Sequence, residues 1–590
     1  MSHPFPRQAP RRRPLARALL SLAALLSAAA CSTQPGAEPA PDRADLLLTN
    51  ARVYTVDTGQ PWAQAVAIRD GRILAVGDDA QLASLRGEDT RVVDLGGRLL
   101  LPAFGDAHAH PQFGGISHSR CPLHDGRTLQ DYQRIIAACV AASPGDGVVY
   151  GVGWEDALFP PNGVPRKEVL DAVSAERPLI FESIGGHSLW LNSRALEAAG
   201  ITRDTPDPPN GHIDRDPATG EPVGGLQETA MALAERLVPP PTAAEREAAI
   251  VHTATHFNSL GITSWHDAGI PFDAGGASET LDAYAAVRGD GRLSAHVAVA
   301  MTWKNDQGLE QLPDLMRASE RAEAMGLVAR SVKFYVDGVI PQQTAYMLEP
   351  YAHAGDARGK PHIDAGALQE AVQRLDAEGF QVHAHAIGDG GVRQALDAIA
   401  AARAANGERG GRHMVSHLNV VDPADQPRFG QLGVAAQFQP LWASHYPYMD
   451  LTRQAIGPLR SQSLYPAGSI LRAGGRLAYG ADWPVASANP LEGLQVAVTR
   501  TNAEDPASGP LLAGEAVTLE QALRAYTIDV AWVNRMDDRL GSIAPGKLAD
   551  LVVLDRNIFE IPAHEIGKTR VLLTLFEGRP VFGDLGLSSP

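Results

Sequence analysis

The chain has 590 residues, 44% of them hydrophobic and 20% charged, which is the composition of a folded globular protein with a large core and an accessory domain. The formal net charge is −17 at pH 7. Because binding to a phosphate backbone needs a basic surface, this charge argues against nucleic acid as a partner.

The first thirty residues have the features of an export signal. Four arginines between positions 11 and 17 precede an apolar stretch at 18–26, which is too short to span a bilayer, and small residues follow. Cys31 comes next, in a setting that resembles a lipoprotein box. We therefore predict a signal peptide at 1–30 and a Pro- and Ala-rich tether at 31–43. The protein is then either a membrane-anchored lipoprotein, held by lipid at Cys31, or a periplasmic protein.

Only two further cysteines follow Cys31. Cys121 and Cys139 either form one disulfide or are two buried thiols, and they are too few for a four-cysteine zinc site. Any metal chemistry must therefore rest on histidines and carboxylates.

Short strand-like segments fill residues 44–100. They are separated by turn residues such as Asp70-Gly71 and Gly96-Gly97. The strands predicted in this part are 45–49, 52–55, 65–69, 72–76 and 91–94. The same pattern of short strand-like segments returns near the end of the chain, at 551–554 and 571–576. Residues 44–100 and 541–590 are predicted to form one small β-sandwich domain.

Residues 101–540 alternate apolar, strand-like runs with helical patterns. The clearest helical patterns lie at 244–260, 366–378 and 391–404. This alternation predicts an α/β fold, a TIM-like (β/α)8 barrel, with its active site at the carboxyl ends of the strands.

A His-x-His pair follows the first strand predicted for the barrel. Period-2 alternation places Asp106, His108 and His110 on one face, so two imidazoles can converge on one cation. Four later apolar runs also end in polar residues, near Lys333, His383, His417 and Asp482. A barrel would bring these strand ends together.

These segments carry a resemblance to a known family. The following motifs occur in the order and spacing of the amidohydrolase superfamily: His108-Ala109-His110, Val332-Lys333, Val382-His383, Ser416-His417 and Gly480-Ala481-Asp482-Trp483-Pro484. More narrowly, Gly151-Val152-Gly153-Trp154, the segments 186–193 and 383–389, and Asp482-Trp483-Pro484-Val485 resemble the YtcJ-like branch, amidohydrolase family 3. That branch includes N-substituted formamide deformylases. The resemblance runs from about residue 44 to the end.

The resemblance implies a centre with one or two divalent ions, zinc by preference. His108 and His110 would bind one zinc, while His383 and His417 would bind a second metal or complete the first site. Lys333 stands where related enzymes hold a carboxylated lysine that bridges two metals; the alternative is an ordinary lysine bound to Asp337 or to substrate. Asp482 would contact the metal and take the proton of the attacking water.

Other residues are candidates for contact with substrate. His383 and His385 point the same way along their strand, so either could be the ligand; the family pattern favours His383 and leaves His385 to the substrate. His187 would donate to a tetrahedral oxyanion, unless it is a buried histidine satisfied by backbone. His266 is also assigned to the pocket. Trp154 either lines the pocket or packs in a core.

The sequence therefore predicts an enzyme, an amidohydrolase acting on carbon–nitrogen bonds other than peptide bonds. It would cleave an amide or formamide with metal-activated water. The alternatives are a deaminase or cyclic amidase with the same centre, and, less favoured because every ligand position is filled, a non-catalytic binding lipoprotein. The expected partner is a small amide-type molecule, with membrane contact only through the lipid anchor, and a homodimer is left open.

Overall fold

The computed structural model describes residues 43–160 and 163–587. The predicted signal peptide, nearly all of the tether and Cys31 lie outside these residues. Within the described ranges, no helix combines the length and apolar character needed to cross a membrane.

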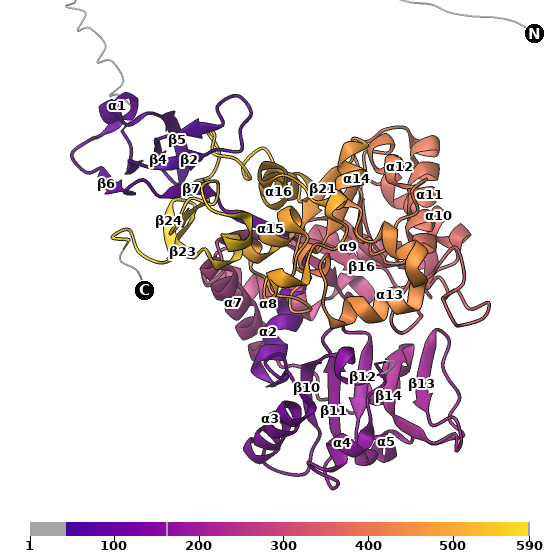
Figure 1. Ribbon diagram of the computed structural model, residues 1–590. Helices are drawn as coiled ribbons and strands as arrows, with labels where there is room; N and C mark the ends of the chain where they lie inside the picture. The colour runs from indigo at the N-terminus through magenta and orange to yellow at the C-terminus, as the bar shows by residue number, and fades with distance from the viewer. Residues whose placement is uncertain (1–42, 161–162, 588–590) are drawn as a thin grey trace, which may run out of the picture. The chain divides into compact units, whose positions relative to one another are not determined.

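Eight parallel strands form a nearly closed barrel sheet, in the order β21-β20-β19-β18-β17-β16-β15-β8 (Figure 1). The strands are β8 (Phe104–Ala109), β15 (Ile262–Ile270), β16 (His296–Thr302), β17 (Val328–Tyr335), β18 (Gln381–Ala386), β19 (Met414–His417), β20 (Ala435–Phe438) and β21 (Arg476–Tyr479). The predicted barrel fold is confirmed. Its strand ends carry the side chains that the sequence analysis singled out.

Helices alternate with these strands. They are α7 (Ala243–Ser259), α8 (Glu279–Gly289), α9 (Leu312–Ala324), α10 (Ala365–Ala377), α11 (Asp389–Asn406), α12 (Gln426–Gln431), α13 (Pro447–Arg460), α14 (Ala467–Arg472), α15 (Pro490–Thr499), α16 (Leu519–Tyr526) and α17 (Ile528–Val533). Local chemistry fixes several starts: Thr242 and Glu245 form a capping box at α7, and the Ser278 side chain accepts from the Leu281 amide at α8. The three helices expected from periodicity match α7, α10 and α11 closely.

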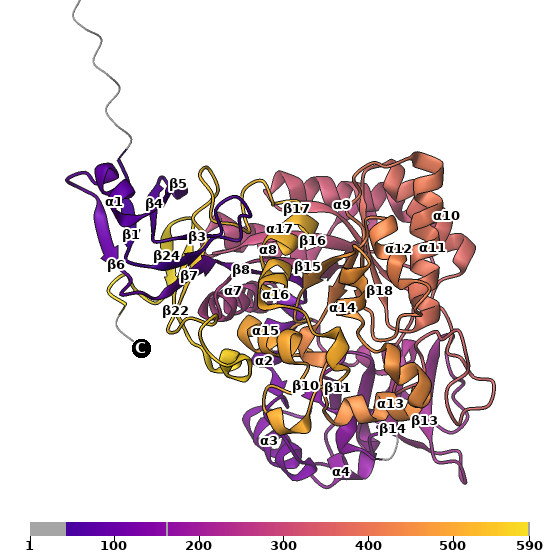
Figure 2. The same cartoon turned by 45° about the horizontal axis from the view of Figure 1, so that its top comes forward.

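Strands from both ends of the described chain share one sheet beside the barrel (Figure 2). A four-stranded sheet has the order β5-β4-β1-β6 and a six-stranded sheet the order β24-β23-β22-β7-β2-β3. Their bounds are β1 (Leu46–Thr49), β2 (Arg52–Tyr54), β3 (Trp62–Ala63), β4 (Ala65–Arg69), β5 (Arg72–Gly77), β6 (Arg91–Asp94), β7 (Leu99–Pro102), β22 (Leu551–Leu554), β23 (Val571–Phe576) and β24 (Arg579–Phe582), with helix α1 (Asp79–Leu82) after β5. Strand β7 pairs with β2 on one side and antiparallel with β22 on the other. Leu48, Leu100, Val553 and Leu573 lie in one core.

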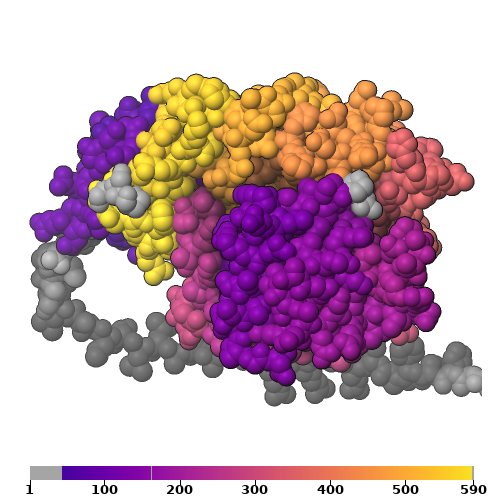
Figure 3. Space-filling model, turned by 60° about the horizontal axis from the view of Figure 1, so that its bottom comes forward, coloured from indigo at the N-terminus to yellow at the C-terminus, as the bar shows by residue number. Residues whose placement is uncertain are grey.

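A separate sheet is inserted between β8 and α7, and the sequence analysis did not foresee it. Its order is β13-β14-β12-β11-β10-β9, and Figure 3 shows it as one continuous block below the orange part of the barrel. The elements are α2 (Pro111–Ser119), β9 (Cys121–Pro122), α3 (Leu129–Ala142), β10 (Val149–Trp154), α4 (Lys167–Asp171), β11 (Leu179–Ser183), β12 (Ser188–Leu191), α5 (Ser193–Ala199), β13 (Gly211–Arg215), β14 (Pro222–Glu228) and α6 (Ala232–Glu235). We call residues 111–242 the insertion. Its strands also alternate with helices, so its pattern resembles that of the barrel.

The insertion contains a disulfide. Cys121 at β9 is joined to Cys139 on α3, with Cα atoms 5.9 Å apart. Of the two alternatives for these cysteines, the structure has the disulfide. Disulfides of this kind persist mainly in oxidising compartments.

Candidate active site

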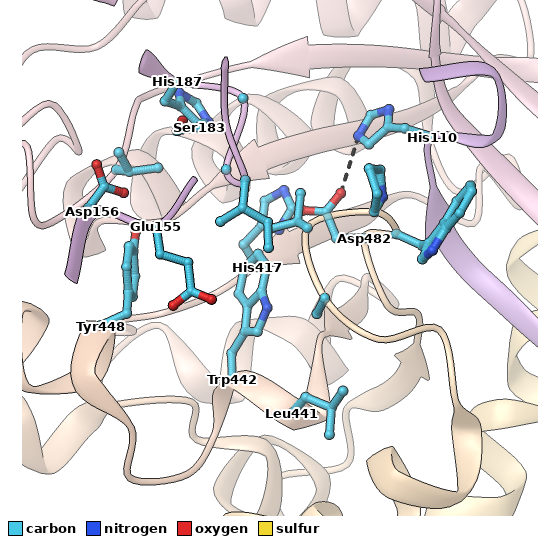
Figure 4. Close-up of a pocket in the computed structure, with 18 of the residues that line it drawn as sticks. His110, Glu155, Asp156, Ser183, His187, His417, Leu441, Trp442, Tyr448 and Asp482 are labelled. Carbon is cyan, nitrogen blue, oxygen red and sulfur yellow. Dashed lines mark ion pairs between the residues drawn. The ribbon is translucent and has the colours of Figure 1, made fainter. Parts of the chain in front are cut away.

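A cavity of about 1770 Å³ lies between the carboxyl ends of the barrel strands and the insertion (Figure 4). Barrel residues such as His110, His417 and Asp482 form one part of its wall. Asp156 and His187, from the insertion, form another part. The insertion therefore builds part of the space above the strand ends.

Three predicted ligands meet at the floor of this cavity. The Nε2 atom of His110 lies 3.2 Å from Asp482 Oδ1, and His108 Nε2 lies 3.4 Å from the same oxygen. Among the residues that the structure describes, these three form the one group of histidines and acids whose ligand atoms all lie within 4.8 Å of one another. They therefore form a candidate metal site.

Backbone bonds hold the two segments of this triad together. The Asp482 amide donates to the His108 carbonyl at 2.7 Å, and the His110 amide donates to the Trp483 carbonyl at 2.9 Å. The buried Asp106 carboxylate accepts from the amides of His108 and Ala481, at 2.8 and 3.0 Å. Asp106 thus joins β8 to the segment after β21, where the barrel sheet is not closed by strand pairing.

The other predicted ligands surround His108. Lys333 Nζ lies 3.0 Å from His108 Nε2, and His383 Nε2 lies 2.8 Å from His108 Nδ1. His417 approaches Asp482, with 3.7 Å between Nδ1 and Oδ2. Lys333, His383 and His417 are at most 2% exposed. The six predicted ligands are therefore neighbours.

The electrostatics of this cluster suit metal ligands. Burial, followed by the charge of Lys333, keeps the pKa of His108 well below its usual value, and burial likewise lowers the pKa of His417 to about 3. Burial alone would raise the pKa of Asp482, but hydrogen bonding from His110 and the neighbouring charges lower it to about 2. At neutral pH His108 and His417 are thus neutral imidazoles and Asp482 is an ionised carboxylate, the protonation states that metal binding requires.

An orphaned atom supports the fit of a cation. Asp482 Oδ1 is buried, and beyond its close contacts with the His108 and His110 rings it has no well-directed hydrogen bond among the described residues. A buried carboxylate oxygen held in this way is costly, and coordination to a cation would satisfy it. His108, His110 and Asp482, with His383, His417 and Lys333 around them, fit a divalent metal.

Lys333 is buried and is not paired with Asp337. Burial lowers the pKa of Lys333 to about 7, so a large fraction is a neutral amine at physiological pH. Asp337 accepts instead from the backbone amides of Tyr346, Ile387 and Gly388. The alternative of a Lys333–Asp337 ion pair is therefore not seen.

His187 forms a polar chain that spans the insertion and the barrel. Its Nδ1 lies 3.0 Å from Glu228 Oε2, and Thr344 Oγ1 donates to Glu228 Oε1 at 2.8 Å. Burial would lower the pKa of His187, but Glu228, together with the charges of Asp482 and Asp156, outweighs burial and the pKa is raised. No role for Glu228 could be predicted from the sequence, because its partners lie 41 and 116 residues away along the chain.

The remaining candidates divide into two groups. His385 lines the cavity, with its ring centroid 4.5 Å from that of His417. His266 lies beside His383 and its Nδ1 is 2.9 Å from the Asn534 side chain; it is buried and does not line the cavity. Trp154 is fully buried, donates to the Phe181 carbonyl and packs on Trp190. The structure therefore places Trp154 in the core of the insertion, the packing alternative, and His266 behind the ligands.

Comparison with known proteins identifies the family. A model described as the amidohydrolase family matches residues 91–582. The chain belongs to this family. As an amidohydrolase, it is a hydrolase that acts on carbon–nitrogen bonds, and His108, His110 and Asp482 form a possible metal site in it.

Relatives align over most of this amidohydrolase. Protein LONG AFTER FAR-RED 3 of Arabidopsis thaliana is 31% identical over 92% of each chain. The putative amidohydrolase YtcJ of Bacillus subtilis is 27% identical, over 90% of this chain and 98% of its own. The N-substituted formamide deformylase of Arthrobacter pascens is 26% identical, over 90% and 97%. The predicted resemblance to the YtcJ-like branch is confirmed.

A solved structure shares the fold. The crystal structure of an uncharacterized metal-dependent hydrolase from Pyrococcus horikoshii superposes with a TM-score of 0.67. It is 21% identical in sequence and covers 88% of this chain and 99% of its own. Most of the fold of this chain is therefore shared with that solved structure.

Proposed function

We propose that the protein hydrolyses an amide or formamide bond of a small molecule with one or two zinc ions. The observation that carries this proposal is the convergence of His108, His110 and Asp482 at the floor of a large cavity. The alignment with an N-substituted formamide deformylase supports the bond type.

Zinc held by these residues would supply Lewis acidity toward the substrate carbonyl and lower the pKa of water at the site. Asp482 is ionised at neutral pH, so it accepts the proton of the attacking water and delivers it to the leaving nitrogen. His187 keeps Nδ1 on Glu228 and uses Nε2 to donate to the carbonyl oxygen as negative charge develops there. His385, on the cavity wall, contacts the substrate.

The proposal is tested by metal analysis of the purified protein together with an assay of N-formyl and N-acyl alkylamines. We expect one or two zinc ions per chain and release of the free amine, with activity lost on chelation and restored by zinc. Cyclic amides and amino-substituted heterocycles are assayed in parallel. Their turnover, with the alkyl amides inert, would replace amide hydrolysis by cyclic amidase or deaminase chemistry. A protein that binds no zinc when it is supplied would overturn the proposal.

Glu228 acts in this scheme as a positioning residue for His187. In Glu228→Gln, we expect kcat/KM to fall about 10- to 100-fold, in line with the loss of an orienting partner. Because Glu228 raises the pKa of His187, its removal lowers that pKa. The alkaline limb of the pH profile should then move to lower pH, since His187 loses its proton earlier.

The matched control is Glu197→Gln, which removes a carboxylate from an ion pair with Arg194 on the surface of the insertion. A pH profile of Glu228→Gln that coincides with that of the wild type and of this control would exclude the assigned role.

A further inference from the structure

The cavity has a second polar end, distinct from the metal site. Figure 4 shows Glu155, Asp156 and Tyr448 on one side of the cavity and His110 and Asp482 on the other. Glu155 and Asp156 follow β10 of the insertion, and Tyr448 lies in the first turn of α13. Residues Glu155, Asp156, Gln342, Tyr446 and Tyr448, all of which line the cavity, are called the acidic end below.

Asp156 is the most informative residue of the acidic end. Its side chain is almost fully enclosed, since the residue is 5% exposed, yet it lines the cavity. Its Oδ1 atom is buried and has no hydrogen-bond partner among the described residues. Burial raises the pKa of Asp156 to about 7, although hydrogen bonding from Gln342 and the charge of His187 oppose this. A donor cation at this end of the cavity would satisfy the unpaired Oδ1 atom.

Other acceptors accompany Asp156. Gln342 Oε1 is likewise buried without a partner among the described residues. The Glu155 carboxylate points into the cavity in Figure 4, and it forms an ion pair with Arg127, with Nη1 and Oε1 3.7 Å apart. A protonated primary amine has three N–H donors and no acceptor, which matches three acceptor groups.

Aromatic rings complete the acidic end. Tyr446 and Tyr448 are stacked, with their ring centroids 6.2 Å apart and their planes 11° apart. The faces of aromatic rings attract cations, and quaternary or protonated amines are held in this way in aromatic cages. Carboxylates beside such rings strengthen the attraction.

The charged side chains around the whole cavity are mostly negative. Carboxylates outnumber lysine and arginine side chains around the cavity. Of the basic groups, Arg127 pairs with Glu155, Lys568 pairs with Glu565, and Lys333 lies within the metal cluster. The negative wall would repel a substrate that carries a carboxylate and attract a substrate that carries a cation.

We propose that the acidic end binds an ammonium group of the substrate, so that the substrate is an amide that carries a protonated amine away from the scissile bond. A singly acylated diamine is the simplest member of this class. The inference rests on the proposed function for the identity of the bond, but the ammonium site itself is independent of hydrolysis.

Binding tests the site without catalysis. Hexylammonium chloride and 1-hexanol are titrated calorimetrically into the purified protein at pH 7.5. We expect hexylammonium to bind and hexanol to bind at least about 10-fold more weakly, because a hydrogen bond to a charged group is worth more than a neutral one. Asp156→Asn should weaken hexylammonium binding about 10- to 100-fold and leave hexanol unchanged.

The control Asp204→Asn removes an exposed carboxylate of the insertion that does not line the cavity, and it should match the wild type. Equal binding of the two ligands, or equal binding of hexylammonium by wild type and Asp156→Asn, would overturn the ammonium site.

Kinetics then connect the site to the substrate. N-Formyl-1,6-diaminohexane is compared with N-formylheptylamine, in which a methyl group replaces the ammonium, and with N-formyl-6-aminohexanoate. We expect kcat/KM to be highest for the diamine, lowest for the carboxylate, and reduced for the diamine alone by Asp156→Asn. Turnover of all three at equal rates would refute the inference and leave amide hydrolysis standing. Turnover of none, with hexylammonium still bound, would count against the proposed function.

Discussion

An Asp482→Asn enzyme is expected to lose between about 100-fold and about 10,000-fold in kcat, the range that general base catalysis supplies. The carboxylate is ionised across the neutral range because its pKa is lowered to about 2, and the amide that replaces it cannot accept a proton. The measurement is the steady-state rate of amine release from an N-formyl amine, beside the zinc content of the variant.

Two comparisons make the result specific. Asp273→Asn removes an exposed carboxylate from the loop after β15 and should leave the rate unchanged. His108→Ala removes a proposed ligand of the same site and should lower zinc content as well as rate. If Asp482→Asn retained more than about a tenth of wild-type kcat, another group would have to carry the proton, since a general base contributes at least about 100-fold.

A Lys333→Ala enzyme is expected to lose at least about 10-fold in activity and to retain one zinc ion or none, if Lys333 is the carboxylated bridge between two ions. The lysine is 1% exposed, and its pKa of about 7 leaves the amine free to react with carbon dioxide. Added acetate or propionate should restore part of the activity, because a short carboxylate can fill the space and take the place of the bridge.

The control for this variant is Lys360→Ala, on the exposed surface. A Lys333→Ala protein with unchanged zinc content and activity would show that the lysine is no ligand. If the wild type and Lys333→Ala each held one zinc ion, the variant were inactive and acetate did not restore its activity, the site would be mononuclear and Lys333 would contact substrate.

Much of the fold could be predicted because its signals are local. The strand predicted at 65–69 is β4, and those predicted at 551–554 and 571–576 are β22 and β23. Alternating apolar residues and tight turns act over a few residues, so they can be recognised in isolation. The ligand cluster could be predicted from the strands as well, because all the parallel strands of a barrel end on the same rim and bring their last side chains together.

The rest depends on contacts between distant segments. The insertion follows a single barrel strand, and nothing in its helix and strand pattern says that its sheet is separate. The role of Glu228 depends on His187 and Thr344, which approach it from the turn before β12 and from the loop after β17. Trp154 stands in a glycine-rich motif, but its ring turns toward Trp190 and Phe159 rather than the cavity.

The pairing of β7 with β22 joins a strand that is synthesised early to one that is synthesised late. Leu100 and Leu101 of β7 leave the ribosome some 450 residues before Val552 and Val553, their neighbours across the sheet. Throughout that interval one edge of β7 has no partner, and unpaired apolar edges invite wrong associations. The last strands to be synthesised are therefore the ones that cover the first, and a chain that stops before them leaves the early sheet open however well its barrel is formed.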